Sequence, residues 1–120
     1  MSNDDQKTWE TYASAWKAES VIDKRALFEK CLDVECEYND PLMKTKGWDE
    51  LLAYMLDFHQ QIPRGYFVTT YFLAHNCQSI AKWEMLNGEN RVVGEGISYG
   101  KYNKNGKLVA MTGFFETHPK

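Results

Sequence analysis

The second half of the chain consists almost entirely of strand-forming segments, and this run constrains the fold more than any other feature. After Pro63 and Gly65, stretches rich in aromatic and β-branched residues cover positions 66–76, 78–87, 91–103 and 107–117. The pairs Asn87-Gly88 and Asn105-Gly106 separate the last three stretches, and an Asn-Gly pair accepts the positive φ angles of a type I′ hairpin turn. We therefore predict that three or four consecutive strands form an antiparallel meander.

Helical patterns occupy most of the first half. Trp9, Tyr12 and Trp16 recur at intervals of three and four residues, which places them on one face of a helix over residues 5–19. A second helix is expected over residues 21–32, because Ser20 and Asp23 resemble a capping box at its start. A third helical pattern covers residues 48–62 and ends at Pro63.

One further strand lies between the second and third helical patterns. Val34, Cys36 and Tyr38 alternate with polar residues, and Pro41 stops the strand before a loop at residues 44–47. The resulting order is α-α-β-α-β-β-β-β. It predicts a single α+β domain over residues 1–120, with helices packed on one face of a curved antiparallel sheet of about four to six strands.

The composition argues against several classes of partner. The 120 residues carry a net charge of -3, and their charges are interspersed, so no basic stripe is present that would neutralise nucleic-acid phosphates. The acidic N-terminus lacks the apolar region of a signal peptide, and no window is apolar enough for a membrane span. Three cysteines without CxxC spacing, Cys31, Cys36 and Cys77, predict reduced thiols and a cytoplasmic location.

No pattern in the sequence indicates a metal or a cofactor. His59, His75 and His118 show neither HxH nor HxxxH spacing. Gly94-x-Gly96 lies within a strand pattern and does not open a helix, so it is not a phosphate-binding loop. We expect neither a cofactor nor a metal.

The segment Tyr38-Asn39-Asp40-Pro41 places a single carboxylate where a strand meets a turn, in a sequence rich in large apolar residues. One interpretation of Asp40 is a general base at an apolar pocket, able to remove a proton next to a carbonyl group. The alternative is an Asp-Pro turn in which the side chain accepts backbone hydrogen bonds. Asp40 is our first candidate catalytic residue.

Two further residues are candidates for the same chemistry. The hydroxyl of Tyr12 would donate a hydrogen bond to a developing oxyanion, or it would belong to a core tyrosine whose hydroxyl lies at the rim. His75 would act as a second acid or as a polar anchor for the ligand, although histidines at strand ends are usually exposed.

The walls of the expected pocket follow from the apolar faces of the elements. Trp83 and Met85 share one face of their strand with Ala81, while Lys82 and Glu84 take the other, so the first two are expected on the concave face. Further wall candidates are Trp16, Leu52, Met55, Met111 and Phe114. This aromatic surplus favours a flat, apolar or polycyclic ligand.

The third long strand has one face nearly without side chains. Gly94, Gly96, Ser98 and Gly100 share that face, which leaves room for a ligand beside Ser98 or lets a helix approach closely. The opposite face is half apolar and would pack against a second subunit; it carries Val93, Glu95, Ile97 and Tyr99. We therefore expect a homodimer formed through the outer face of the sheet.

Several motifs together resemble the nuclear-transport-factor-2-like superfamily, and more narrowly its SnoaL-like members. They are the Trp- and Tyr-bearing first helix, Tyr38-x-Asp40-Pro41, Gly47-Trp48-Asp49-Glu50-Leu51, His75-Asn76 followed by Trp83, and Asn105-Gly106-Lys107-Leu108 leading to Gly113-Phe114-Phe115. They span nearly the whole chain. The resemblance implies a cone-shaped sheet with three helices that close a pocket, commonly in a homodimer.

The resemblance also bears on the chemistry. In ketosteroid isomerase, a member of this superfamily, a first-helix Tyr and an Asp before a Pro work with a second, protonated Asp on a late strand. Tyr12 and Asp40 match the first two by spacing, whereas the late-strand position falls near Ser98 and has no acid. The Asp-Arg-Asp cluster of the epoxide hydrolases with this fold is not evident either.

Two function hypotheses remain open. The first is a pocket protein that binds an apolar, carbonyl-bearing molecule and catalyses proton transfer as an isomerase, cyclase or dehydratase, with Asp40 as base and Tyr12 as donor. The second is a binding or interaction module with the same fold and no chemistry.

Overall fold

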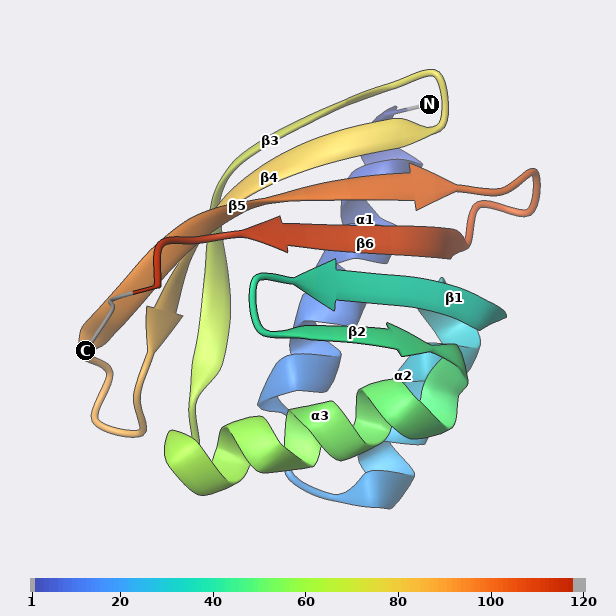
Figure 1. Ribbon diagram of the computed structural model, residues 1–120. Helices are drawn as coiled ribbons and strands as arrows, with labels where there is room; N and C mark the ends of the chain where they lie inside the picture. Colours follow the sequence, from blue (N-terminus) through green and yellow to red (C-terminus); the bar gives the residue numbers. More distant parts are fainter. Residues whose placement is uncertain (1, 118–120) are drawn as a thin grey trace.

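Three helices lie inside the curve of a six-stranded sheet (Figure 1). The computed structural model describes residues 2–117. The helices are α1 (Ser2–Lys17), α2 (Val21–Cys31) and α3 (Gly47–Gln61). The strands are β1 (Leu32–Asp40), β2 (Met43–Lys46), β3 (Tyr66–His75), β4 (Gln78–Leu86), β5 (Val92–Tyr102) and β6 (Leu108–Phe114).

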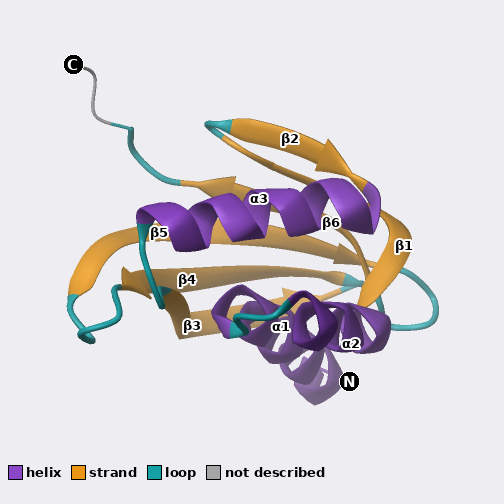
Figure 2. Cartoon of the chain, turned by 90° about the horizontal axis from the view of Figure 1, so that it is seen from below, coloured by secondary structure: helices purple, strands orange, loops and turns teal. Residues whose placement is uncertain are grey.

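The strands follow the order β2-β1-β6-β5-β4-β3 across the sheet. Strands β3 to β6 form the predicted antiparallel meander. β1 pairs with β6 in parallel, because α3 and the meander carry the chain across between them. The sheet is therefore mixed; it is strongly curved and remains open, with β2 and β3 at its edges (Figure 2). The α+β, cone-like architecture predicted from the sequence is confirmed.

A short strand, β2, takes the place of part of the predicted loop at residues 44–47. It forms a hairpin with β1 in which Asp40 lies opposite Met43. The side chain of Asp40 closes this turn, since its Oδ1 accepts hydrogen bonds from the backbone N–H groups of Leu42 (2.8 Å) and Met43 (3.0 Å). Pro41 thus ends β1, as predicted, and the chain then reverses direction at once.

The two Asn-Gly pairs do not form the type I′ turns that we predicted. In the loop after β4 the positive φ angle belongs to Asn90 (64°), and in the loop after β5 it belongs to Gly106 (80°). The side-chain oxygens of Asn87 and Asn103 each accept two backbone N–H groups within their loops. This capping stabilises a loop longer than the two residues of a type I′ turn.

A two-residue turn does connect β3 to β4. Its residues are Asn76 and Cys77, whose φ angles are 50° and 61°, and it is flanked by the cross-strand pair of His75 and Gln78. Positive φ at both central positions is the type I′ requirement. This turn is hard to predict from the sequence because it contains no glycine.

The core lies between the helices and the concave face of the sheet. Its fully buried side chains include Phe28 of α2, Leu51 and Met55 of α3, and Leu108 and Met111 of β6. Ser20 caps the N-terminus of α2 as predicted, with the backbone N–H of Asp23 donating to Oγ of Ser20 (3.0 Å). Within residues 2–117, no helix is both long enough and apolar enough to cross a membrane.

A buried lysine joins the three helices. Lys24 of α2 donates from Nζ to the carbonyl oxygen of Ala15 in α1 (2.8 Å), and the same Nζ lies 3.1 Å from Nε2 of His59 in α3. Burial lowers the pKa of Lys24 to about 8. Burial, and then the charge of Lys24, also lower the pKa of His59, so its imidazole stays neutral and accepts from the lysine.

Candidate functional site

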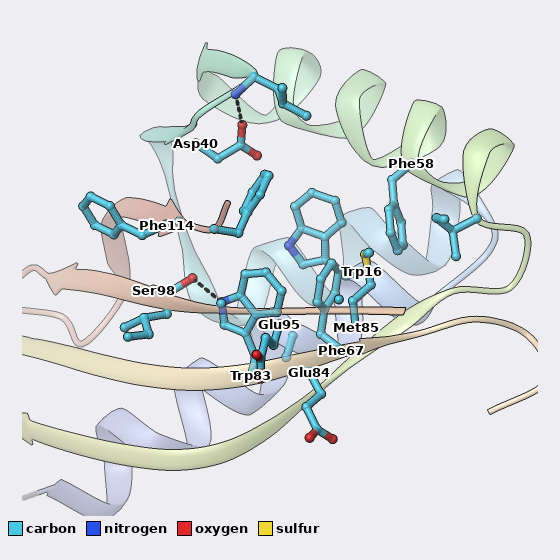
Figure 3. A pocket seen from close by; sticks show the side chains of 18 of the residues that line it. Trp16, Asp40, Phe58, Phe67, Trp83, Glu84, Met85, Glu95, Ser98 and Phe114 are labelled. Atoms are coloured by element: carbon cyan, nitrogen blue, oxygen red, sulfur yellow. Dashed lines mark hydrogen bonds between the residues drawn. The ribbon is translucent and has the colours of Figure 1, made fainter. Parts of the chain in front are cut away.

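An open pocket of about 1220 Å³ lies between α1, α3 and the concave face of the sheet (Figure 3). Trp16 of α1 forms the centre of its aromatic wall. The centroid of the Trp16 ring lies 5.4 to 6.0 Å from the ring centroids of Phe67, Phe58, Tyr38 and Tyr54. These contacts have the edge-to-face or tilted geometry that aromatic pairs prefer, so the wall is packed and pre-formed.

Helical spacing explains how two helices reach the pocket. The residues that line it are separated by one, three or four positions, so each helix turns one face to it. From α1 they are Trp9, Tyr12, Ala13 and Trp16, and from α3 they are Tyr54, Asp57, Phe58 and Gln61.

Strands β4 and β5 form the sheet side of the pocket. Trp83 and Met85 of β4 line it as predicted, and they lie opposite Gly96 and Gly94 of β5. Because these glycines have no side chains, the backbone of β5 itself borders the cavity. The alternate side chains of β4 and β5 belong to the other face, and Figure 3 shows Glu84 turned away from the cavity.

The carboxylate of Asp40 lies at the pocket and accepts four hydrogen bonds. Its Oδ1 closes the turn after β1, as described above. Its Oδ2 accepts from the hydroxyl groups of Tyr38 (2.5 Å) and Tyr54 (2.9 Å). A carboxylate offers about four lone-pair sites, so the available sites of Asp40 are occupied. Asp40 is therefore a turn residue that also lies at the pocket, while its role as a general base stays a prediction.

The two tyrosines that bind Asp40 are neutral donors. Burial, followed by the influence of Tyr12 and Asp40, raises the pKa of Tyr38, and burial together with its hydrogen bond to Asp40 raises the pKa of Tyr54. Each phenol has one hydrogen, and each gives that hydrogen to Asp40. Toward the pocket these two hydroxyl oxygens therefore present only lone pairs.

Tyr12 lines the same pocket as Asp40. Its side chain is buried, and burial raises the pKa of its hydroxyl, while a hydrogen bond with the side chain of Trp16 acts in the opposite direction. The tyrosine is thus a neutral hydrogen-bond donor in the cavity that holds the carboxylate.

Ser98 of β5 lies near this group of polar residues. Its Oγ accepts a hydrogen bond from the indole N–H of Trp83 (2.9 Å). A Cβ atom placed on Gly113 would lie 3.6 Å from Cβ of Asp40, 3.7 Å from Oγ of Ser98 and 3.8 Å from the hydroxyl oxygen of Tyr38. Gly113 therefore lies where β1, β5 and β6 bring these polar side chains together.

Four of the residues proposed for the site lie elsewhere. Leu52, Met55 and Met111 do not line the pocket; they are buried in the core. Periodicity predicted the inward face of their elements correctly, but it does not tell a core position from a pocket position on that face. His75 is exposed at the far end of β3, beside Asn76, with 3.0 Å between its Nδ1 and Nδ2 of Asn76. These positions remove all four from our candidate site. Phe114 does line the pocket, at its mouth, where it is exposed.

The sequence reasoning missed several residues of the site. Tyr38 shares a strand face with Asp40, two positions away, and that parity was a usable signal. Tyr54 precedes Phe58 by one helical turn, but it lies on the flank of the apolar stripe, so helical spacing does not single it out. The strand pattern around Phe67 carries no signal for a pocket residue. Within the part of the chain that the structure describes, no group of three metal-ligating side chains converges.

No protein-family profile and no curated protein matches the sequence. The fold nevertheless has close structural counterparts. One is a candidate isomerase of the SnoaL-like family from Agrobacterium tumefaciens, with a TM-score of 0.87 and 22% identity, covering 96% of this chain and 99% of that chain.

Two further solved structures are similar at lower identity. One is a candidate SnoaL-like polyketide cyclase from Jannaschia sp., with a TM-score of 0.75 and 10% identity, covering 95% of this chain and 86% of that chain. The other is an NTF2-like protein of unknown function from Cytophaga hutchinsonii, with a TM-score of 0.70 and 11% identity, covering 93% and 89% of the two chains. At these identities the similarity establishes the fold and leaves the ligand open.

Proposed function

Because the chain has the SnoaL-like fold of the nuclear-transport-factor-2-like superfamily, as its motifs predicted, we propose that it binds an apolar, aromatic molecule bearing a carbonyl group. The observation that supports this most directly is one cavity that combines an aromatic wall around Trp16 with the polar group of Tyr12, Asp40 and Ser98. Concave sites of this kind, apolar with a few convergent polar groups, are typical of small-molecule binding.

The size of the pocket supports a polycyclic ligand. Its volume is about 1220 Å³, part of which lies at the open mouth. Small-molecule sites typically enclose roughly 300 to 1,000 Å³. A flat molecule of about two or three fused rings, bound against the aromatic wall around Trp16, is compatible with this volume.

The unused hydrogen-bond donors support a carbonyl group on that molecule. The hydroxyl hydrogens of Tyr38 and Tyr54 are bound to Asp40. Within residues 2–117, the hydroxyl of Ser98 accepts a hydrogen bond from the indole N–H of Trp83, and no hydrogen bond is found in which the hydroxyl of Tyr12 or of Ser98 donates. Two hydroxyl groups with hydrogens left to donate suit a carbonyl oxygen, which only accepts.

Calorimetric titration with acetylnaphthalene tests this proposal, and ethylnaphthalene serves as a control of similar shape without the carbonyl oxygen. The ketone is expected to bind more tightly than the hydrocarbon. In Tyr12→Phe the affinity for the ketone should fall about threefold to tenfold, the value of one neutral hydrogen bond, while the hydrocarbon binds as before. If neither compound binds the wild-type protein, the proposal is wrong.

A second candidate function is proton transfer on such a ketone, and the shared cavity of Asp40 and Tyr12 favours it. Oδ2 of Asp40 would take a proton from the carbon beside the carbonyl. The C–H bond breaks, an O–H bond forms, and the electron pair moves to the carbonyl oxygen, where Tyr12 donates a hydrogen bond. Return of the proton to another carbon completes an isomerisation without a cofactor.

The hydrogen bonds at Asp40 set a condition on this chemistry. Oδ2 must release one donor before it accepts a proton, and Tyr54 is the less buried of its two tyrosines. Deuterium exchange at the methyl group of acetylnaphthalene in D₂O, followed by NMR, tests the step. Deuterium exchange that is faster than in buffer alone, and that loses this excess rate in Asp40→Asn, supports catalysis. If the wild-type protein does not accelerate exchange, it binds the ketone without catalysing this step.

We also propose a second copy of the chain as the partner of the convex face of the sheet. By strand alternation this face carries the exposed apolar side chains of Val68, Tyr71, Leu73, Ile80 and Ile97. Lys82 and the cross-strand pair of Glu84 and Glu95 lie among them. In a two-fold dimer the lysine of each copy can meet the glutamates of the other, which supports self-association.

The thiols support a cytoplasmic location, which is likewise our proposal. Cys31, Cys36 and Cys77 are all free, as expected in a reducing compartment.

A further inference from the structure

We infer that the pocket selects a positively charged ligand, an aromatic or polycyclic molecule that also carries an amine or quaternary ammonium group. This inference rests on the proposed function, because it specifies the charge of the ligand in the same pocket. The supporting observations are the positions of the charged side chains around an aromatic cavity.

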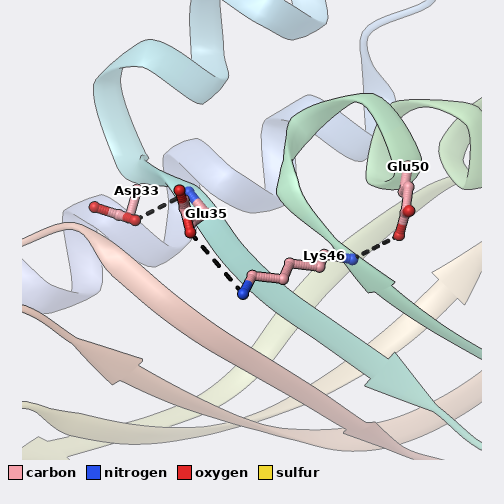
Figure 4. Close-up of polar contacts among 4 residues, drawn as sticks. All are labelled: Asp33, Glu35, Lys46 and Glu50. Carbon is pink, nitrogen blue, oxygen red and sulfur yellow. Dashed lines mark hydrogen bonds and ion pairs between the residues drawn. The ribbon is translucent and has the colours of Figure 1, made fainter.

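The negative charge of Asp40 has no cationic partner. All four groups that donate to it are neutral: two tyrosine hydroxyls and two backbone N–H groups. The salt bridges found within residues 2–117, Arg25 with Asp49 and Lys46 with Glu35, lie outside the pocket (Figure 4 shows the second). The cavity therefore holds a carboxylate that forms no ion pair with the described residues.

Basic side chains are kept out of the cavity. Among the described residues that line it, Lys82 is the one with a basic side chain. Its Nζ lies 5.5 Å from the centroid of the Tyr71 ring, its cross-strand neighbour on the convex face. The lysine therefore contributes backbone to the cavity and turns its charge away from it.

A second carboxylate lies at the rim. Asp57 of α3 is exposed and lines the pocket one residue before Phe58. Its charge lies close enough to Tyr54 to add to the effects of burial and of Asp40 that raise the pKa of that tyrosine. Asp40 and Asp57 thus give the pocket a negative electrostatic potential, and a cleft of this kind concentrates cations.

The aromatic wall favours the same charge. A cation within about 6 Å of a ring centroid is attracted by the ring, and the effect raises affinity about twofold to thirtyfold. The Phe67 ring lies 5.1 Å from that of Trp83 and 5.4 Å from that of Trp16, centroid to centroid, so one cation can approach more than one ring.

The polar atoms point to a donor-bearing ligand as well. The hydroxyl oxygens of Tyr38 and Tyr54 have given their hydrogens to Asp40 and present only lone pairs. An ammonium group beside these two oxygens can donate to their lone pairs, whereas a carboxylate in the same place would meet acceptors and the charge of Asp40. This side of the cavity therefore favours a cation over an anion.

Three matched probes test the inference: naphthylmethylamine, which is a cation at neutral pH, naphthalenemethanol, which is neutral, and naphthoate, which is an anion. Calorimetric titration of the full chain should give the tightest binding for the amine, by about threefold to thirtyfold over the alcohol, and the weakest for naphthoate. Raising the salt concentration from about 20 mM to about 150 mM should narrow the difference between amine and alcohol, because rim charges are screened.

Two charge-removing variants locate the effect. Asp57→Asn should lower the ratio of amine to alcohol affinity, whereas Glu29→Gln, an equal charge change on an exposed part of α2, should leave that ratio unchanged. A ratio equally affected by both variants would show a general effect of net charge and overturn the inference.

The outcomes separate this inference from the proposed function. If the three probes bind with equal affinity, or naphthoate binds best, the inference fails while binding of apolar ligands stands. If none of them binds and acetylnaphthalene does not bind either, the proposed function fails and the inference falls with it.

Discussion

The indole of Trp83 occupies the space that a side chain at Gly96 would need. A Cβ atom at Gly96 would lie 2.7 Å from Cη2 of Trp83 and 2.6 Å from the carbonyl oxygen of Phe114. The two residues face each other across β4 and β5, and the indole N–H bonds to Ser98 two positions further along β5. The bare stretch of β5 thus holds a wall of the pocket in place.

We expect Gly96→Ala to destabilise the protein and displace Trp83. The new methyl group would overlap the indole on one side and backbone on the other, and overpacking of this kind costs about 1 to 3 kcal/mol. The midpoint of urea unfolding measures the loss.

Gly94→Ala is the matched control for that variant. A Cβ atom at Gly94 would meet Cε of Met85 at 3.0 Å, and this is the end of a flexible side chain that can move. The control should lose much less stability than Gly96→Ala. Equal losses would mean that Trp83 is not fixed by the missing side chain.

The buried lysine predicts a specific dependence of stability on pH. Folding lowers the pKa of Lys24 from 10.5 to about 8, so between these values the unfolded chain holds more protons than the folded one. The contribution of Lys24 to the free energy of unfolding therefore rises with pH across this window. Relative to Lys24→Met, the wild type should gain about 2 kcal/mol between pH ~8 and ~10, measured by urea unfolding at each pH.

Other groups titrate in the same range and must cancel in the comparison. Burial raises the pKa of Cys31 to about 12 and that of Cys36 to about 11. Above pH 9.0 these thiols ionise more readily in the unfolded chain, so their contribution to the free energy of unfolding falls as the pH rises. Both thiols are present in the wild type and in Lys24→Met, so the difference in unfolding free energy between these two proteins reports Lys24 alone. Lys30→Met, at an exposed position of the same helix, should show no such pH dependence. If the difference in unfolding free energy between the wild type and Lys24→Met does not change with pH, the prediction is wrong.

Periodic patterns in the sequence predicted which faces of the helices and strands point inward. The spacing of Trp9, Tyr12 and Trp16 correctly assigned the inner face of α1, and strand parity placed Trp83 on the concave side. Periodicity gives the face of an element but not the position along its axis. Met55 therefore has the correct face yet lies in the core, and His75 lies beyond the end of the cavity.

The turns were the least predictable part of the fold. An Asn-Gly pair is compatible with several loop geometries, and the side-chain caps of Asn87 and Asn103 selected longer loops. Conversely, the turn at Asn76 and Cys77 adopts positive φ angles without any glycine. The fourfold hydrogen bonding of Asp40 also depends on Tyr54, which is distant in sequence and reaches the carboxylate only through the packing of α3 on the sheet.

Sedimentation equilibrium tests the proposed self-association. We expect a dimer, because the convex face exposes a cross-strand apolar pair, Leu73 and Ile80, beside complementary charges. Ile80→Glu should produce monomers, while Ile22→Glu, at an exposed apolar residue of α2, should leave the dimer intact. A wild-type protein that stays monomeric at high concentration rules the dimer out.

The indole N–H signals of nitrogen-15-labelled protein report directly whether ligands bind in the aromatic pocket. Trp16 and Trp83 line the pocket, whereas the indole of Trp48 donates to the carbonyl oxygen of Asp33 (3.0 Å) and lies outside it. On titration with acetylnaphthalene, the signals of Trp16 and Trp83 should shift in proportion to occupancy, and that of Trp48 should not move. Unchanged Trp16 and Trp83 signals, or a shift of Trp48 as large as theirs, would contradict the account.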